Sequence, residues 1–215
     1  MAKRKASSTG FKKALEIGRP PNIKKLFPNS NALIVSGKVV DRAMIAKGKA
    51  IAMAANGRNQ FVIRGALQAA QRANAPIIIE IAKSEGGKKA YCAVNYWNIA
   101  MLVDTLCNQL GITVPVAVHA DHYGIRDEKD LEAAKVEIPS FFDAGLTSVA
   151  IDASHLPDDK NLLANIVIHP YIPKWAGLET EVGEIKGKKG FPRLKRPCFS
   201  SRGSMPTISF RIGSL

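Results

Sequence analysis

The sequence predicts an α/β fold built on a parallel sheet. Short apolar runs alternate with longer segments of helical periodicity, and this cycle repeats along the body of the chain. The five predicted strands are KAIAMAANG, PIIIEIAKS, VPVAVHADH, TSVAIDASH and GLETEVGEI. Such alternation is typical of right-handed βαβ units, in which each helix returns the chain to the start of the next parallel strand.

A predicted helix stands between each pair of strands. In the first helix, apolar residues such as Phe61, Val62 and Ala66 recur at helical spacing. The four predicted helices are QFVIRGALQAAQRANA, VNYWNIAMLVDTLCNQLG (closed by Gly111), EKDLEAAKVEIPSFFDAG and NLLANIVIHPYIPKWA. The body of the chain therefore reads as a continuous series of βα units.

Polar side chains gather at the carboxyl end of each predicted strand. They are Asn56, Glu80 and Ser84, the run from His119 to His122, the run from Asp152 to His155, and Glu179 with Glu181. In parallel α/β architectures, ligands bind at the carboxyl ends of the strands. The pattern therefore predicts one site assembled from several strand ends.

The positive charge lies at the two ends of the sequence. The 215 residues carry a formal net charge of +13. Residues 1–50 hold 12 Lys/Arg against 2 acids, a net of +10, and residues 191–215 hold 5 against none. Residues 51–190 hold 14 against 16 and are slightly acidic. The basic ends are either solvated flanks or sites for polyanions, such as phosphorylated substrates or RNA.

The expected location is cytoplasmic and away from membranes. No apolar run approaches the roughly 20 residues needed to span a bilayer. The start, MAKRKASSTGFKK, lacks the apolar core of a secretion signal, although an organelle transit peptide stays an alternative. The three cysteines, Cys92, Cys107 and Cys198, form no CxxC pattern, which favours a reducing compartment.

Three regions are predicted along the chain. Residues 1–40 read as a basic N-terminal extension with a short helix at GFKKALEIG, and residues 41–190 form the α/β body. Residues 191–215 read as an irregular basic tail, because they contain no acids and show no helical period. This abrupt change in composition suggests a shifted reading frame or a truncated gene.

The stretch HADHYG contains two of the four histidines of the chain. On a strand, His119 and Asp121 point to one face, and His122 points to the other face or into the turn. A neutral imidazole is a common zinc ligand, and a neighbouring carboxylate can move a proton. The alternative is a pair of histidines that hydrogen-bond to the backbone at a strand end.

The stretch LETEVGE places two acids on one strand face. Glu179 and Glu181 alternate with apolar residues, and buried carboxylates require a cation, either a metal or a Lys/Arg side chain. Asp152 ends the preceding strand and adds a third inward acid. Together with His122, these residues offer the nitrogen and oxygen ligands that suit Zn²⁺ or another divalent cation.

Three motifs in order, HADHYG, DAGLTSVAIDASH and GLETEVGEI, resemble the class II fructose-bisphosphate aldolases, which are metal-dependent. The resemblance runs from about residue 37 to about residue 190. It implies an α/β fold of the TIM (β/α)8 barrel family that is incomplete, with about five βα units. The chain then resembles an aldolase truncated after the fifth barrel strand.

The resemblance also implies roles for individual residues. By analogy with the family motifs, His122 and Glu181 bind the catalytic Zn²⁺ or another divalent cation, and Asp121 is the acid/base. Asp152 and Glu179 line a second cation site, and Asn56 contacts the substrate. Relatives carry two further histidines in later strands, whereas this sequence has none after His169, which is expected to be structural or exposed.

The implied activity is reversible cleavage of fructose 1,6-bisphosphate to dihydroxyacetone phosphate and glyceraldehyde 3-phosphate, in glycolysis and gluconeogenesis. Loss of activity through truncation is one alternative, and a tagatose-bisphosphate aldolase is another. A third is a non-catalytic basic half-barrel that binds a polyanion such as RNA, although a nucleic-acid partner is not favoured. The expected partners are a phosphorylated sugar and further copies of the chain in a homo-oligomer, since relatives are commonly dimers or larger.

Overall fold

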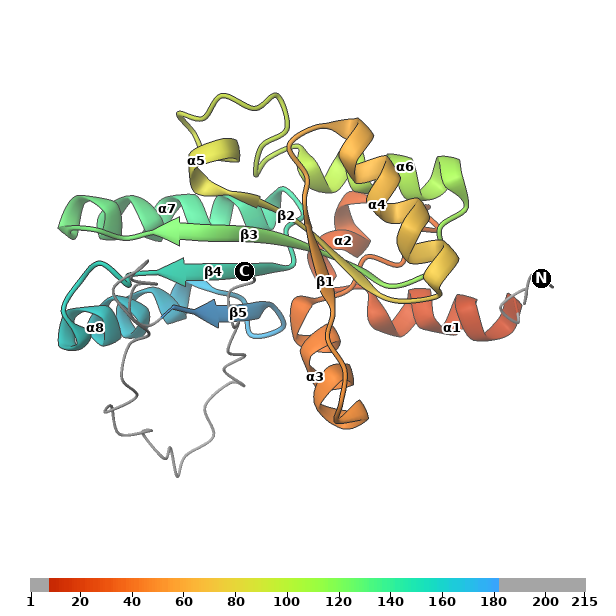
Figure 1. The fold of residues 1–215 in the computed structure, drawn as a ribbon, viewed down its shortest axis with the longest axis horizontal. Coiled ribbons are helices and arrows are strands. Elements are labelled where there is room, and N and C mark those ends of the chain that lie inside the picture. The colour runs from red at the N-terminus through yellow and green to blue at the C-terminus, as the bar shows by residue number, and fades with distance from the viewer. Residues whose placement is uncertain (1–7, 182–215) are drawn as a thin grey trace, which may run out of the picture.

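The structure is a computed structural model, and it describes residues 8–181 (Figure 1). Its centre is a five-stranded sheet in the order β1-β2-β3-β4-β5, and every neighbouring pair is parallel. The strands are β1 (Met53–Asn56), β2 (Ile77–Ala82), β3 (Val116–Gly124), β4 (Ser148–Asp152) and β5 (Gly177–Thr180). All five predicted strands are present, and the predicted α/β fold is confirmed.

Helices follow the strands as the periodicity predicts. The long ones in this part of the chain are α4 (Gln60–Ala73), α6 (Ile99–Leu110), α7 (Glu128–Asp143) and α8 (Asp158–Ile168). A single turn, α5 (Lys83–Gly86), directly follows β2, and a 3-10 turn, η1 (His169–Tyr171), follows α8. Before the sheet lie α1 (Ser8–Gly18), α2 (Pro21–Leu26) and α3 (Gly37–Lys47).

Local sequence sets where these helices begin and end. The side chain of Asn59 accepts hydrogen bonds from the backbone N–H groups of Phe61 and Val62, so α4 begins there. Asn74 ends α4 in the left-handed conformation, and Gly111 ends α6 with φ of 62°. These caps fix the return of the chain to β2 and β3.

The two faces of the sheet differ in character. Isoleucines and valines such as Ile79 and Val118 point to the face covered by the helices and form the main core. On the opposite face, strand register creates layers. Ala54, Ile78 and Ala117 align in an apolar lower layer. Asn56, Glu80, His119 and Ser148 align in the next, which we call the middle layer.

The segment before residue 41 contributes more to the core than an extension would. Ile23 and Ile34 are fully buried, and Ile34 forms a parallel bridge with Val116 of β3. The Arg19 guanidinium donates to the backbone carbonyls of Ile23 and Ser30. Burial of apolar side chains, not the basic composition, decides where this segment lies.

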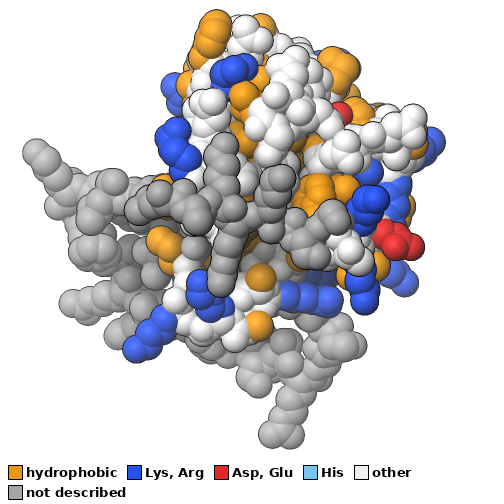
Figure 2. All heavy atoms as spheres, turned by 90° about the vertical axis from the view of Figure 1, so that its right-hand side faces the viewer, with side chains coloured by type: hydrophobic (Ala, Val, Ile, Leu, Met, Phe, Trp, Pro, Cys, Tyr) orange, Lys and Arg blue, Asp and Glu red, His pale blue; other side chains and the backbone are white. Residues whose placement is uncertain are grey.

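One face of the molecule is rich in positively charged side chains (Figure 2). In Figure 2, which shows the right-hand side of Figure 1, Lys and Arg side chains are more frequent than Asp and Glu. Among residues 8–181, no helix is both long and apolar enough to cross a membrane. The predicted tail, residues 191–215, lies outside the described residues.

Candidate active site

The backbone of β3 is irregular where the candidate site begins. The register with β4 shifts between Ala120 and Tyr123, and His122 has φ of 44°, in the left-handed region. A non-glycine residue pays for this conformation, and such outliers cluster at functional sites. The bulge gives His122 a different direction from the regular alternation of His119 and Asp121. The sequence left open whether His122 points to the other face of the strand or into the turn. The bulge is the physical reason why its side chain departs from the regular alternation.

His122, Asp152 and Glu181 converge at the carboxyl ends of three strands, and we call this set the upper-edge cluster. His122 Nδ1 lies 2.9 Å from Glu181 Oε1 and 3.6 Å from Asp152 Oδ2. One ligand atom from each of the three residues lies within 4.8 Å of the others. The His122 side chain is 57% exposed and that of Glu181 is 24% exposed, so the cluster is open to solvent.

The electrostatics of the upper-edge cluster favour a cation. Burial works to lower the pKa of His122, but the carboxylates around it, above all Asp121, raise it overall. Burial raises the pKa of Glu181, and the neighbouring charge of Asp152 raises it further. Carboxylates crowded in this way repel each other, and a divalent cation among them would relieve that repulsion.

Neighbouring groups fix the ligand atoms of the cluster. The Ser154 hydroxyl donates to Asp152 Oδ1 at 2.6 Å, and the Ser154 backbone N–H donates to the same oxygen at 3.1 Å. This leaves Asp152 Oδ2 directed to His122. The Asn161 amide donates to the backbone carbonyl of Glu181 at 2.9 Å. Such supporting contacts orient ligands and raise metal affinity.

Asp121 lies beside the cluster and is buried. Its Oδ2 is 3.9 Å from His122 Nε2. The buried Tyr96 hydroxyl donates to the backbone carbonyl of Asp121 at 3.1 Å, which holds this part of β3. A carboxylate next to a candidate cation site is well placed to exchange a proton with a bound ligand.

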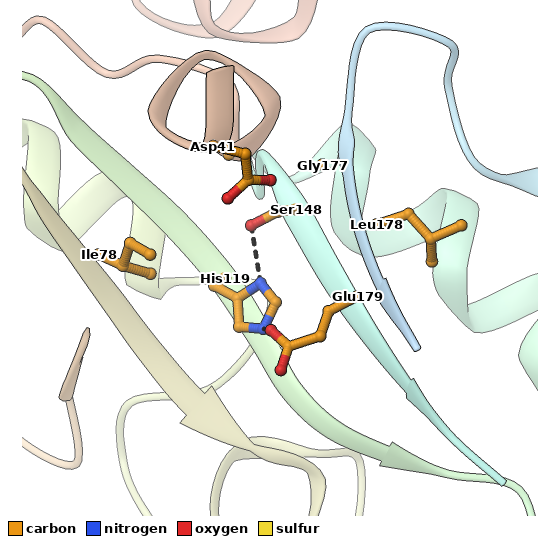
Figure 3. A pocket seen from close by; sticks show the side chains of 8 residues that line it. Asp41, Ile78, His119, Ser148, Gly177, Leu178 and Glu179 are labelled. Atoms are coloured by element: carbon orange, nitrogen blue, oxygen red, sulfur yellow. Dashed lines mark hydrogen bonds and ion pairs between the residues drawn. The ribbon is translucent and has the colours of Figure 1, made fainter. Parts of the chain in front are cut away.

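His119 lies deeper, in the middle layer. Its Nδ1 is 2.7 Å from Ser148 Oγ, and its Nε2 is 3.7 Å from Glu179 Oε2. Figure 3 shows the imidazole between these two side chains, with Asp41 beyond Ser148. These residues line a cavity of about 30 Å³. The hydrogen bond to Ser148 makes His119 part of a buried polar network.

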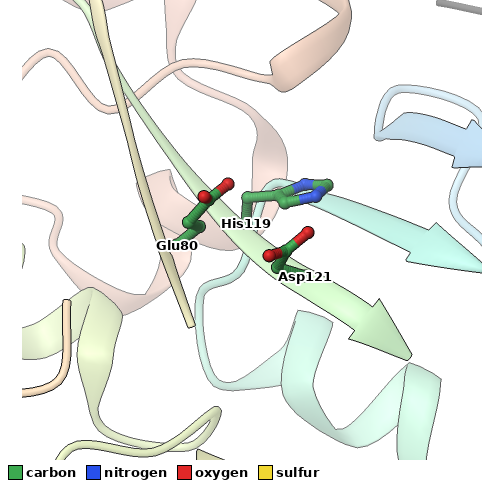
Figure 4. Close-up of side chains that lie close together, drawn as sticks. All are labelled: Glu80, His119 and Asp121. Carbon is green, nitrogen blue, oxygen red and sulfur yellow. The ribbon is translucent and has the colours of Figure 1, made fainter. Parts of the chain in front are cut away.

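Glu80 belongs to the polar strand ends predicted to form one site, but no individual role was predicted for it. Glu80, His119 and Asp121 are all buried, and one ligand atom from each lies within 4.8 Å of the others. Figure 4 shows the three side chains on the same side of the sheet. The signal in the sequence was an acid inside the apolar run PIIIEIA.

The structure brings the predicted site residues together in a grouping of its own. His122 and Glu181 are adjacent, as expected for two ligands of one cation. Asp152 lies with them, whereas Glu179, its predicted partner in a second cation site, lies against His119. Asn56 ends β1, and its amide donates to Glu85 Oε2 at 2.5 Å.

The fold and site define a class of protein: a β/α barrel-type sheet with its polar site at the carboxyl ends of the strands. Within that class, the chain belongs to the class II fructose-bisphosphate aldolase family. The model of the family described as "Fructose-bisphosphate aldolase class-II" matches residues 38–202, which is most of the chain. The resemblance noted in the three motifs is thereby confirmed.

Curated relatives bear the same family name. The chain is 36% identical over 135 residues to the fructose-bisphosphate aldolase of Staphylococcus aureus (strain Mu50). It is 37% identical over 139 residues to that of Streptococcus pneumoniae serotype 4. These matches cover 62% of this chain but only 43% and 41% of the relatives. The chain therefore spans less than half of the length of these relatives.

A solved structure shares the fold. The fructose-bisphosphate aldolase of Campylobacter jejuni superimposes with a TM-score of 0.55 at 23% identity. The match covers 74% of this chain and 49% of that chain. At this identity the similarity supports the fold, and it agrees with a sheet that forms part of a TIM-type barrel.

Proposed function

We propose that the chain carries the metal and acid/base part of a class II aldolase site that acts on a sugar bisphosphate. The observation that supports this most is the convergence of His122, Asp152 and Glu181 beside the buried Asp121. The imidazole and carboxylates match the ligand preferences of Zn²⁺, although other divalent cations also accept such a set. A bound cation would act as a Lewis acid on the carbonyl oxygen of the substrate.

The protein groups would then share the remaining work. His122, Glu181 and Asp152 hold the cation. Asp121 takes the proton of the C4 hydroxyl when fructose 1,6-bisphosphate is cleaved, and returns it to the aldehyde oxygen during condensation. No lysine is required as a nucleophile in this scheme. The products are dihydroxyacetone phosphate and glyceraldehyde 3-phosphate, which places the reaction in glycolysis and gluconeogenesis.

Two alternative functions have different experimental signatures. A tagatose-bisphosphate aldolase would use the same upper-edge cluster and differ only in the sugar that it prefers. A polyanion-binding module would bind RNA with an affinity that falls steeply with salt and does not depend on a divalent cation.

Cys92 and Cys107 are free thiols, which agrees with the cytoplasmic location that we propose.

The test is an aldol-cleavage assay with the full chain loaded with Zn²⁺. We expect cleavage of fructose 1,6-bisphosphate that a chelator abolishes, and a loss of at least about 100-fold in Asp121→Asn with unchanged Zn²⁺ binding. Asp143→Asn, an exposed aspartate at the end of α7, is the matched control. Absence of chelator-sensitive cleavage of either fructose or tagatose bisphosphate in the Zn²⁺-bound protein would contradict the proposal.

A further inference from the structure

Glu85 is a buried acid outside the upper-edge cluster. It lies in α5, the single turn after β2, and its side chain is only 9% exposed. Its two oxygens have different partners: Oε2 accepts from Asn56 Nδ2 at 2.5 Å, and Oε1 forms an ion pair with Arg58 Nη2. The contact joins the end of β1 to the turn that follows β2.

This contact fixes which way the Asn56 carboxamide points. An ionised carboxylate can only accept hydrogen bonds, so the amide nitrogen, not the oxygen, must face Glu85. Arg58 forms an ion pair with the other carboxylate oxygen, Oε1, which leaves Oε2 to Asn56. Asn56 Oδ1 is consequently on the other branch of the carboxamide, away from Glu85.

Asn56 Oδ1 is a buried acceptor that receives no hydrogen bond within the described part of the chain. Such an acceptor costs free energy until a donor reaches it. In the register of the sheet, Asn56 pairs with Glu80, and Glu80 pairs with His119. Asn56 therefore belongs to the middle layer, one layer below Asp121 on the same face of the sheet.

We propose that Glu85 is a positioning residue for Asn56: it holds the carboxamide so that Oδ1 accepts a hydrogen bond from a hydroxyl group of the sugar-phosphate substrate. This rests on the proposed function, because it requires the substrate to bind on this face of the sheet. Glu85 itself touches no substrate. Its effect passes through the orientation of one amide group.

The first test needs no ligand. In the ¹⁵N-labelled full chain, we expect the Asn56 side-chain amide to give one set of slowly exchanging resonances, identified by their absence in Asn56→Ala. In Glu85→Gln the new amide can bond to either end of the Asn56 carboxamide, so exchange should accelerate at least about tenfold and the resonances should move. Unchanged Asn56 resonances in Glu85→Gln would overturn the proposal.

Two further variants serve as controls. Glu132→Gln removes an exposed acid that pairs with Lys135 on α7, and it should leave the Asn56 resonances unchanged. Arg58→Met removes the ion pair but keeps the hydrogen bond from Asn56 to Glu85, so the Asn56 resonances should also stay in place. If Glu85→Gln does not fold, a shift of the Asn56 resonances in Arg58→Met to those of a free carboxamide would overturn the proposal, because Oε2 should hold the amide without Arg58.

The second test adds dihydroxyacetone phosphate to the Zn²⁺-loaded protein and measures Kd by calorimetry. We expect Glu85→Gln to weaken binding about tenfold, but less than twofold when Asn56 is already alanine. Equal losses in both backgrounds would show that Glu85 acts without Asn56 and would overturn the proposal. No binding by the wild-type chain would contradict the proposed function and the substrate part of this inference, while the amide exchange would still decide whether Glu85 orients Asn56.

Discussion

The upper-edge cluster and the middle layer are neighbouring polar regions of one sheet, but they balance their charges differently. In the middle layer, His119 is bonded to a neutral hydroxyl, Ser148, and both residues are buried. In the upper-edge cluster, His122 is half-exposed and faces carboxylates at the ends of two other strands. The first arrangement holds its histidine by a hydrogen bond to a neutral group, whereas the second is an excess of negative charge that a cation can neutralise.

The largest effect that separates the two regions should be on metal binding. We expect His122→Ala and Glu181→Ala to weaken Zn²⁺ binding by at least about 100-fold, because supporting residues around a metal already account for 10–100-fold. Competition with a chromophoric chelator measures this. His169→Ala, an exposed histidine in η1, is the control and should bind normally. Equal affinities in all three variants would place the cation elsewhere.

The same titration decides between one cation and two. If Asp152 acts with His122 and Glu181, as their distances suggest, Asp152→Asn should lower affinity more than Glu179→Gln does. If Asp152 and Glu179 line a second site, as the family resemblance implies, either variant should reduce the stoichiometry from two ions to one. These outcomes are distinguishable in a single calorimetric experiment.

An intermediate effect should separate stability from affinity. Ser148→Ala removes the hydrogen bond to the buried His119, and we expect it to reduce the free energy of unfolding by about 1–3 kcal/mol without changing Zn²⁺ affinity. Ser154→Ala should do the reverse: it frees Asp152 and weakens Zn²⁺ binding up to about 10-fold, with less effect on stability. Urea denaturation and calorimetry on both variants measure the two quantities. A loss of Zn²⁺ affinity in Ser148→Ala would mean that the regions are coupled.

The smallest effect concerns Asp41, which lines the cavity below the middle layer. Burial raises its pKa in the folded state. A raised pKa means that its contribution to stability is fully present below the unfolded pKa and is lost as pH rises through the folded pKa. Asp41→Asn should therefore match the wild type in acid and exceed it in stability at neutral pH.

Urea denaturation at acidic and neutral pH tests this prediction. Asp143→Asn, at an exposed position, is the matched control and should show a smaller difference between the two pH values. A less stable Asp41→Asn variant at neutral pH would indicate that the carboxylate has a favourable partner that outweighs its burial.

Much of the fold could be predicted from the sequence, because the period of the apolar residues matches the buried face of each helix or strand. The five strands and the polar ends of those strands were predicted correctly, and His122, Asp152 and Glu181 do converge. The left-handed backbone at His122 could not be predicted, because nothing local demands it and the register shift between β3 and β4 is a tertiary feature. The same holds for Glu85, which meets Asn56 only after a complete βαβ unit has folded.

The N-terminal segment shows a different limit. Its basic composition suggested a solvated extension, yet Ile23 and Ile34 are buried in the main core. Arg19 contributes to both descriptions, since it is a cation in the sequence and a donor to backbone carbonyls in the structure. Net charge describes the average electrostatic character of the surface and carries little information about where single apolar residues pack.

The layers on the sheet face opposite the main core also set a requirement for the design of a fragment that packs against this face. A fragment packed against this face would meet apolar side chains at the level of Ala54 and Ile78, where hydrophobic filling is sufficient. One layer higher it would meet Glu80 and His119, and there an all-aliphatic design would offer no hydrogen bonds to the buried polar side chains. A successful partner fragment would therefore need apolar side chains against the lower layer and hydrogen-bonding side chains against the middle layer.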